Sequence, residues 1–140
     1  MSITESPLYL KIKSHKTITL GHLFFFENFV VAEFNHGVTL DYESLESFYS
    51  LIKEHFGNND YGLVSNRINS YAIVLSDAPK INKKSNNLKA YATVTYNTLA
   101  EKVIEVENHF LKFNKQNFHS LNDAISWVEN TLALRSLALN

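Results

Sequence analysis

The polar groups best suited to chemistry lie together in the segment Ser65–Tyr71. Arg67 carries a guanidinium that can hold a carboxylate or a phosphate through two parallel hydrogen bonds. Amide and hydroxyl groups lie beside it, from Asn66, Asn69, Ser70 and Tyr71. The segment follows an apolar run, and ligands of open α/β sheets bind beyond the carboxyl ends of the strands. These five residues are therefore our candidate site for a ligand or a partner.

The same segment has two other interpretations. Asn and Ser side chains commonly close turns, in which case Arg67 is solvated or paired with a carboxylate. Ser70 also offers a hydroxyl that a kinase could phosphorylate. The sequence leaves the turn, the ligand contact and the phosphorylation site open.

Other patterns of catalysis or metal binding are missing from the sequence. The six histidines lack the spacing of zinc sites; they are His15, His22, His36, His55, His109 and His119. There is no Gly-x-Ser-x-Gly motif and no cysteine nucleophile, and the four glycines stand too far apart to cradle a phosphate. We therefore expect no enzymatic activity, no metal site and no cofactor.

Composition predicts one globular domain, with a core from about residue 8 to residue 132. The 140 residues are 45% apolar and 19% charged, and the absence of cysteine excludes disulfides. A net charge of −1 gives no basic field to attract nucleic acid. The first residues do not form a signal peptide, and the apolar run Leu23–Phe26 is too short to cross a bilayer. We expect a cytoplasmic protein.

Runs of apolar, aromatic and β-branched residues predict the strands. They are Leu8–Lys13, Thr17–Phe26, Phe29–Phe34, Tyr61–Asn66, Leu88–Tyr96 and Leu111–Phe113. Glu27 and Asn28 separate two of these strands and predict a hairpin, with one long bent strand as the alternative.

Apolar residues at helical spacing predict the helices. They cover Asp41–Phe56, Asn97–Phe110 and the chain from Ser120 onward, with a short helix over Asp77–Lys84. The first carries an apolar stripe of Leu45, Phe48, Tyr49, Ile52 and Phe56. The stripe of the second is Leu99, Val103, Val106 and Phe110, and that of the last is Leu121, Ala124, Ile125, Val128 and Leu132. We expect these stripes to face the core, and the tail Leu134–Asn140 to fray.

The order of these elements predicts an α/β fold. Strands come first and then alternate with helices, which favours a mixed sheet whose later strands are parallel. We expect about five or six strands with four helices packed on the sheet.

From about Phe29 to Leu132 the chain resembles a STAS domain, in the SpoIIAA-like (STAS/SEC14) branch. Three segments carry the resemblance: Asn28–Asp41, Leu88–Phe110 and Phe118–Val128. It implies a STAS-like fold and a signalling module that works through protein–protein contact. Signalling members carry an Asp-Ser-Ser-Gly type motif whose serine a partner kinase phosphorylates. At the matching positions this chain has Asn69 in place of Asp, Ser70 as the acceptor and Ala72 in place of Gly.

A dense run of phenylalanines ends the predicted strand Thr17–Phe26. Consecutive residues of a strand point to opposite faces, so Phe24, Phe25 and Phe26 must occupy both faces, with Phe29 close by. A helix of the same chain, a second copy or a lipid-like ligand must cover them. Two functions remain. One is a module that contacts a protein partner, a second copy included; the other carries a small anionic or lipid-like ligand in a large apolar cavity beside Arg67 and Tyr71.

Overall fold

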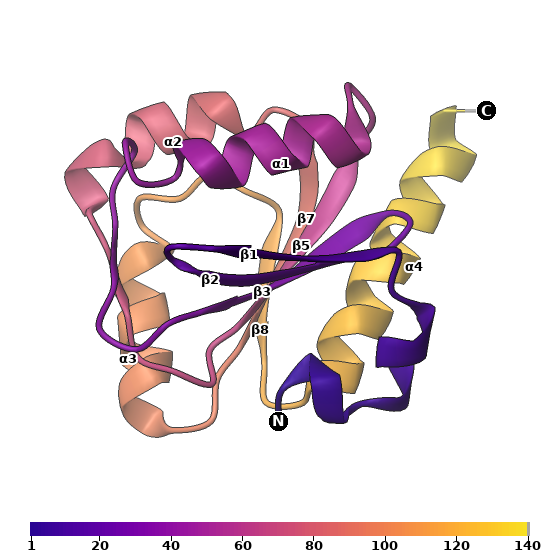
Figure 1. Ribbon diagram of the computed structural model, residues 1–140. Helices are drawn as coiled ribbons and strands as arrows, with labels where there is room; N and C mark the ends of the chain where they lie inside the picture. Colours follow the sequence, from indigo (N-terminus) through magenta and orange to yellow (C-terminus); the bar gives the residue numbers. More distant parts are fainter. Residues whose placement is uncertain (140) are drawn as a thin grey trace.

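The computed structural model describes residues 1–139, which form an α/β fold around a mixed six-stranded sheet (Figure 1). The strands lie in the order β1 (Ser14–Ile18), β2 (Gly21–Phe25), β3 (Phe29–Phe34), β5 (Tyr61–Asn66), β7 (Leu88–Val94) and β8 (Lys115–Phe118). β1, β2 and β3 pair antiparallel, whereas β3, β5, β7 and β8 pair parallel. A second, small sheet joins β4 (Thr39–Leu40) to β6 (Ala72–Ile73). The predicted α/β class and mixed sheet are confirmed.

The helices divide between the two faces of the large sheet. α1 (Glu46–Phe56), α2 (Ala78–Lys84) and α3 (Thr98–Glu107) lie in the successive crossovers between parallel strands and cover one face. α4 (Leu121–Leu139) covers the other, together with the 3₁₀ turns Ile3–Glu5 and Pro7–Lys11 (Figure 1). Crossovers of one hand place all three connecting helices on the same side.

Each face of the sheet has its own apolar core. The stripe of α1 is buried against one face, and that of α4 is buried against the other from Leu121 to Val128, with Leu132 partly buried. Gly62 lets α4 approach closely, because a Cβ there would lie 2.3 Å from Val128 Cγ1. The predicted stripes of these two helices are confirmed as buried faces.

The phenylalanine run is covered by the chain itself. Phe24 and Phe25 are 2% and 1% exposed, and Phe26 and Phe29 are each 5% exposed. Phe25 lies against α1, where its ring centroid is 5.9 Å from that of Phe56, while Phe24 lies against the amino-terminal segment. These rings therefore need neither a second copy nor a lipid to leave water.

Two of the strands predicted in the first part of the chain are wrong. Leu8–Lys13 is not a strand, because Ser6 caps the backbone N–H of Leu8 and Pro7 starts a 3₁₀ turn. Thr17–Phe26 is two strands, since the chain reverses at Thr19 and Leu20 between β1 and β2. The hairpin at Glu27 and Asn28 is confirmed, because β2 and β3 pair antiparallel.

The predictions near the carboxyl end also need correction. The last strand is β8, Lys115–Phe118, rather than Leu111–Phe113, because the N–H of Leu111 still donates to the carbonyl of Glu107 at the end of α3. β8 is a polar edge strand, so apolar patterning could not reveal it. The tail is helical through Leu139; Asn140 lies outside the described residues. The short helix is confirmed as α2, with Pro79 in its first turn.

The orientation of α3 differs most from the prediction. It begins at the predicted cap, where the Asn97 side chain accepts a hydrogen bond from the N–H of Ala100. Its buried residues are Ile104 and Glu107, whereas the predicted buried stripe faces outward. Periodicity reveals which residues share a helix face, but it does not say what that face meets.

Candidate functional site

β5 ends within the candidate segment. The extended backbone at its end turns the side chains of Asn66 and Arg67 in different directions. Neighbouring residues of a strand point to opposite faces, so Asn66 and Arg67 diverge. Asn66 turns toward the amino-terminal segment, and Arg67 turns toward α3. The five candidate residues consequently serve different parts of the molecule.

Arg67 forms a buried ion pair with Glu107. Arg67 Nη1 donates to Glu107 Oε2 at 3.1 Å, and Nη2 donates to Oε1 at 2.5 Å. The two residues are only 6% and 3% exposed. A two-pronged pair of this kind has a fixed geometry, so it anchors α3 to the end of β5.

Aromatic and hydroxyl groups surround this pair. The guanidinium carbon of Arg67 lies 4.5 Å from the centre of the Tyr71 ring, and the Tyr71 hydroxyl lies 2.5 Å from Ser65 Oγ. Burial alone would lower the pKa of Arg67, but Tyr71, Tyr91 and Glu107 together raise it above its usual value. Burial raises the pKa of Tyr71. Arg67 therefore stays charged, and both of its Nη atoms are occupied by Glu107. Its Nε is buried and has no hydrogen-bond partner among the described residues, so the group is not open to an external anion.

Asn66 belongs to a second buried network at the ends of β3, β5 and β7. Glu33 Oε2 accepts hydrogen bonds of 2.7 Å from both Asn66 Nδ2 and the backbone N–H of Ile3. Ser2 Oγ donates to Glu33 Oε1 at 2.6 Å, and the Tyr96 hydroxyl donates to Asn66 Oδ1 at 2.6 Å. Burial, followed by the nearby Glu33 carboxylate, raises the pKa of Tyr96 to about 12. The network ties the amino-terminal residues to the sheet.

The remaining candidate residues belong to the loop after β5. Asn69 Nδ2 donates to the carbonyl of Phe34 at 3.1 Å, and the carbonyl of Ser70 accepts from the N–H of Gly37 at 2.8 Å. These hydrogen bonds therefore hold the loop against the end of β3. Ser70 is exposed to solvent, whereas Tyr71 is partly buried beside Arg67.

A small apolar cavity lies between the sheet and the helices α1 and α2. Its volume is about 60 Å³, and its lining includes Tyr71, Tyr91 and Phe34. Pockets that hold drug-sized ligands measure about 300–1,000 Å³. The cavity is therefore far smaller than a lipid or a comparable ligand requires.

Several polar partners in these networks escaped the sequence reasoning. Glu33 and Glu107 are acidic residues inside apolar segments, which is the one signal that could have identified them as buried charges. Tyr96 closes a predicted strand and gave no such signal.

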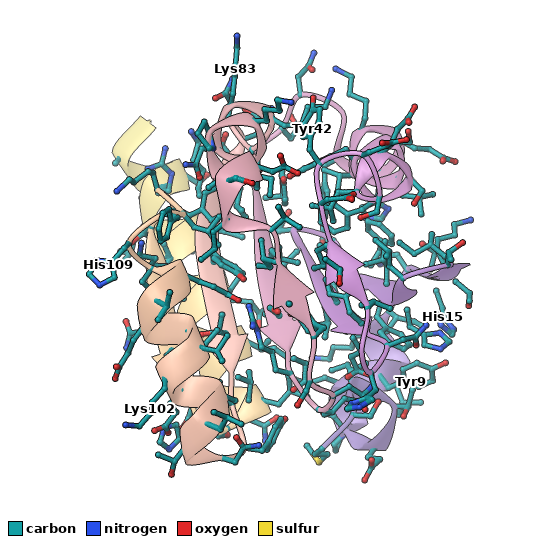
Figure 2. All side chains as sticks on the ribbon, turned by 90° about the vertical axis from the view of Figure 1, so that its left-hand side faces the viewer. Tyr9, His15, Tyr42, Lys83, Lys102 and His109 are labelled. Atoms are coloured by element: carbon teal, nitrogen blue, oxygen red, sulfur yellow. The ribbon has the colours of Figure 1, made fainter. Side chains whose placement is uncertain are left out.

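The outer face of α3 is the other distinctive feature of this part of the molecule. Its apolar side chains are 72% (Leu99), 37% (Val103) and 52% (Val106) exposed, and Phe110 in the turn after the helix is 43% exposed. Tyr96 just before the helix is 42% exposed, and Ile68 after β5 is 39% exposed. Figure 2 looks onto this side of the molecule, where Lys102 projects outward from α3 and His109 projects outward from the turn after it.

The fold and these networks define an α/β protein with a mixed sheet, two buried polar networks and an uncovered apolar face on α3. Comparison of the chain with protein-family models, with curated proteins and with solved structures finds no match. Among residues 1–139, no helix is both long and apolar enough to cross a membrane.

Proposed function

We propose that the protein is a non-enzymatic module that acts through protein–protein contact, with the outer face of α3 as its contact surface. The carrying observation is that the apolar stripe Leu99, Val103, Val106 and Phe110 is exposed. Contiguous apolar patches on a folded protein mark sites of interaction. The resemblance to STAS domains, whose SpoIIAA-like members are signalling modules, supports the same class of function.

The stripe points outward because of how α3 is anchored. The capped amino end, buried Ile104 and the pair between Glu107 and Arg67 together fix the rotation of the helix about its axis. Turning the stripe inward would expose Ile104 and pull Glu107 from Arg67. Breaking such a buried pair costs about 3–5 kcal/mol. The apolar face is thus a fixed part of the surface.

The spacing of the stripe favours a second copy of the chain as its occupant. The residues are separated by four, three and four positions, and this series reads the same in both directions along the helix. Two antiparallel α3 helices related by a two-fold axis would set Val103 against Val106, and Leu99 against Phe110 in the turn that follows the partner's helix. A two-fold interface requires this self-complementarity. Apolar residues at alternating spacings of three and four also interdigitate as knobs in holes.

The charges beside the stripe do not oppose such a pairing. Lys102 and Glu105 flank it with opposite signs, and the whole chain carries a net charge of only −1. Antiparallel pairing brings Lys102 of each copy within one helical turn of the level of the partner helix's Glu105. Opposite charges at the rim of an interface help to set its register.

The alternative function, a carrier of a small anionic or lipid-like molecule, receives less support. Arg67 is occupied by Glu107, and the apolar cavity measures only about 60 Å³. A wider hollow of about 1040 Å³ lies elsewhere, but it is open and lined by charged and amide groups such as Lys13, Asp60 and Arg135.

Cross-linking tests the pairing directly, because the chain has no cysteine of its own. A Val103→Cys chain is mixed with a mass-tagged Val106→Cys chain under mild oxidation. We expect a disulfide between the two chains, since facing residues of paired helices come within disulfide reach. The control replaces Val106→Cys by Leu10→Cys, which is 89% exposed and lies on the amino-terminal 3₁₀ turn. Equal yields from the two mixtures would rule out the proposed surface.

A further inference from the structure

His15 and His22 form a close pair on the two outermost strands at one edge of the sheet. β1 and β2 pair antiparallel, with His15 opposite Phe24 and Thr17 opposite His22. Residues two apart in a strand share a face, so all four side chains project to the same side. The nearest ring nitrogens, His15 Nε2 and His22 Nδ1, are 3.0 Å apart.

A neighbouring aromatic side chain supports the His15 ring. The His15 ring stacks on Phe24, with 4.4 Å between ring centroids and 18° between the planes. Phe24 is 2% exposed and meets Tyr9 edge-on, so the platform beneath His15 is part of the core. Figure 2 shows His15 at the rim of the molecule, with its ring open to solvent.

We propose that His15 Nε2 and His22 Nδ1 together bind a divalent late transition-metal ion of the Zn²⁺ or Ni²⁺ class. Imidazole nitrogens bind zinc at about 2.0–2.1 Å, so two nitrogens on one ion lie about 2.9 Å apart at a right angle and about 3.3 Å apart in a tetrahedron. The separation in this pair lies within that range. To bind one ion, the rings must turn so that both lone pairs leave the line between the two nitrogens and converge on the metal, while the separation of the nitrogens stays nearly the same.

The tautomers of the two rings are compatible with coordination. In the metal-free pair one imidazole donates its N–H to the lone pair of the other. On binding, the proton between the rings moves to the far nitrogen of the same ring through solvent, so that both facing nitrogens offer lone pairs. Neutral rings thus bind the metal with no net loss of a proton.

The remaining coordination positions belong mainly to solvent. Thr17 Oγ1 lies 3.3 Å from His22 Nδ1 and is the nearest further oxygen donor in the strand pair. Glu33 lies opposite His22 on β3, but Ser2, Ile3 and Asn66 already bind its carboxylate. Within residues 1–139 no group of three or more such ligands comes together. A bound ion would accordingly tie β1 to β2 and keep open positions for water or an external ligand.

The test is a titration of the tag-free protein with NiCl₂ and with ZnCl₂, followed by calorimetry in a buffer that does not bind metals. We expect one ion per chain for the wild type. His15→Asn and His22→Asn should each weaken binding by about tenfold or more, the loss that even outer-sphere partners of a metal can cause. His36→Asn is the matched control, since it alters a solvent-exposed histidine that is not a member of the pair and should leave the affinity unchanged.

A second measurement guards against a folding defect in the variants. Far-ultraviolet circular dichroism and the melting temperature without metal should match the wild type, because His15 is exposed and His22 is only partly buried. Added metal should raise the melting temperature of the wild type and of His36→Asn only. The proposal is wrong if the wild type does not bind, or if His15→Asn and His22→Asn bind as the wild type does. It is independent of the contact surface on α3.

Discussion

Arg67 and Glu107 form a pair of opposite charges withdrawn from water at the junction of β5 and α3. Removing one partner leaves the other charge buried and uncompensated, which costs about 3–5 kcal/mol. We therefore expect Arg67→Ala and Glu107→Ala each to lower the free energy of unfolding by about this amount, measured by urea denaturation.

The double variant Arg67→Met with Glu107→Leu separates the stability lost through an uncompensated charge from the stability lost through poorer packing. Apolar replacement of both members of a buried pair is often close to neutral, so we expect this chain to be more stable than either single variant. A double variant less stable than both single variants would contradict the assignment of the stability loss to an uncompensated charge.

At the scale of the element, α3 offers a comparison within one helix. Ile104 is 3% exposed and Val106 is 52% exposed, although only one residue separates them. We expect Ile104→Ala to cost about 2–5 kcal/mol of stability. Val106→Ala should stay within about 0.5 kcal/mol of the wild type. Urea denaturation at a protein concentration low enough to keep the chain monomeric measures both, and equal losses would mean that the stripe is buried.

The elements differ in how far the sequence could predict them. In α1 and α4 the apolar stripe is also the buried face, so periodicity gave both the helix and its orientation. In α3 the same kind of stripe lies outside, because the buried side is completed by Glu107, a charge that finds its partner 40 residues away. β8 is short and polar, and its place beside β7 depends on tertiary pairing that local pattern does not encode.

The same limit applies to the candidate site. The sequence located the end of β5 correctly and identified a polar cluster there. Strand alternation then divides Asn66 from Arg67, and their partners Glu33 and Glu107 come from β3 and α3. Only the assembled sheet brings these groups together, so the reasoning along the chain could list the residues but could not pair them.

At the scale of the whole molecule, the question is whether the chain stays a monomer or forms a symmetric dimer through the uncovered face of α3. The two apolar cores are complete without a second copy, and the phenylalanine run is covered internally. A dimer would therefore be formed by folded monomers, and changes to the stripe should alter association without unfolding the chain. Association and folding can therefore be measured separately.

Sedimentation equilibrium over a wide range of protein concentration provides that test, with the wild type, Val106→Glu and Ser50→Glu compared in one buffer. Ser50→Glu adds the same charge at an exposed position of α1 and is the matched control. We predict that the wild type and Ser50→Glu form dimers, and that Val106→Glu remains a folded monomer because its carboxylate cannot be buried unpaired in the interface. A wild-type chain that stays monomeric at every concentration, or a Val106→Glu chain that still dimerises, would contradict the account.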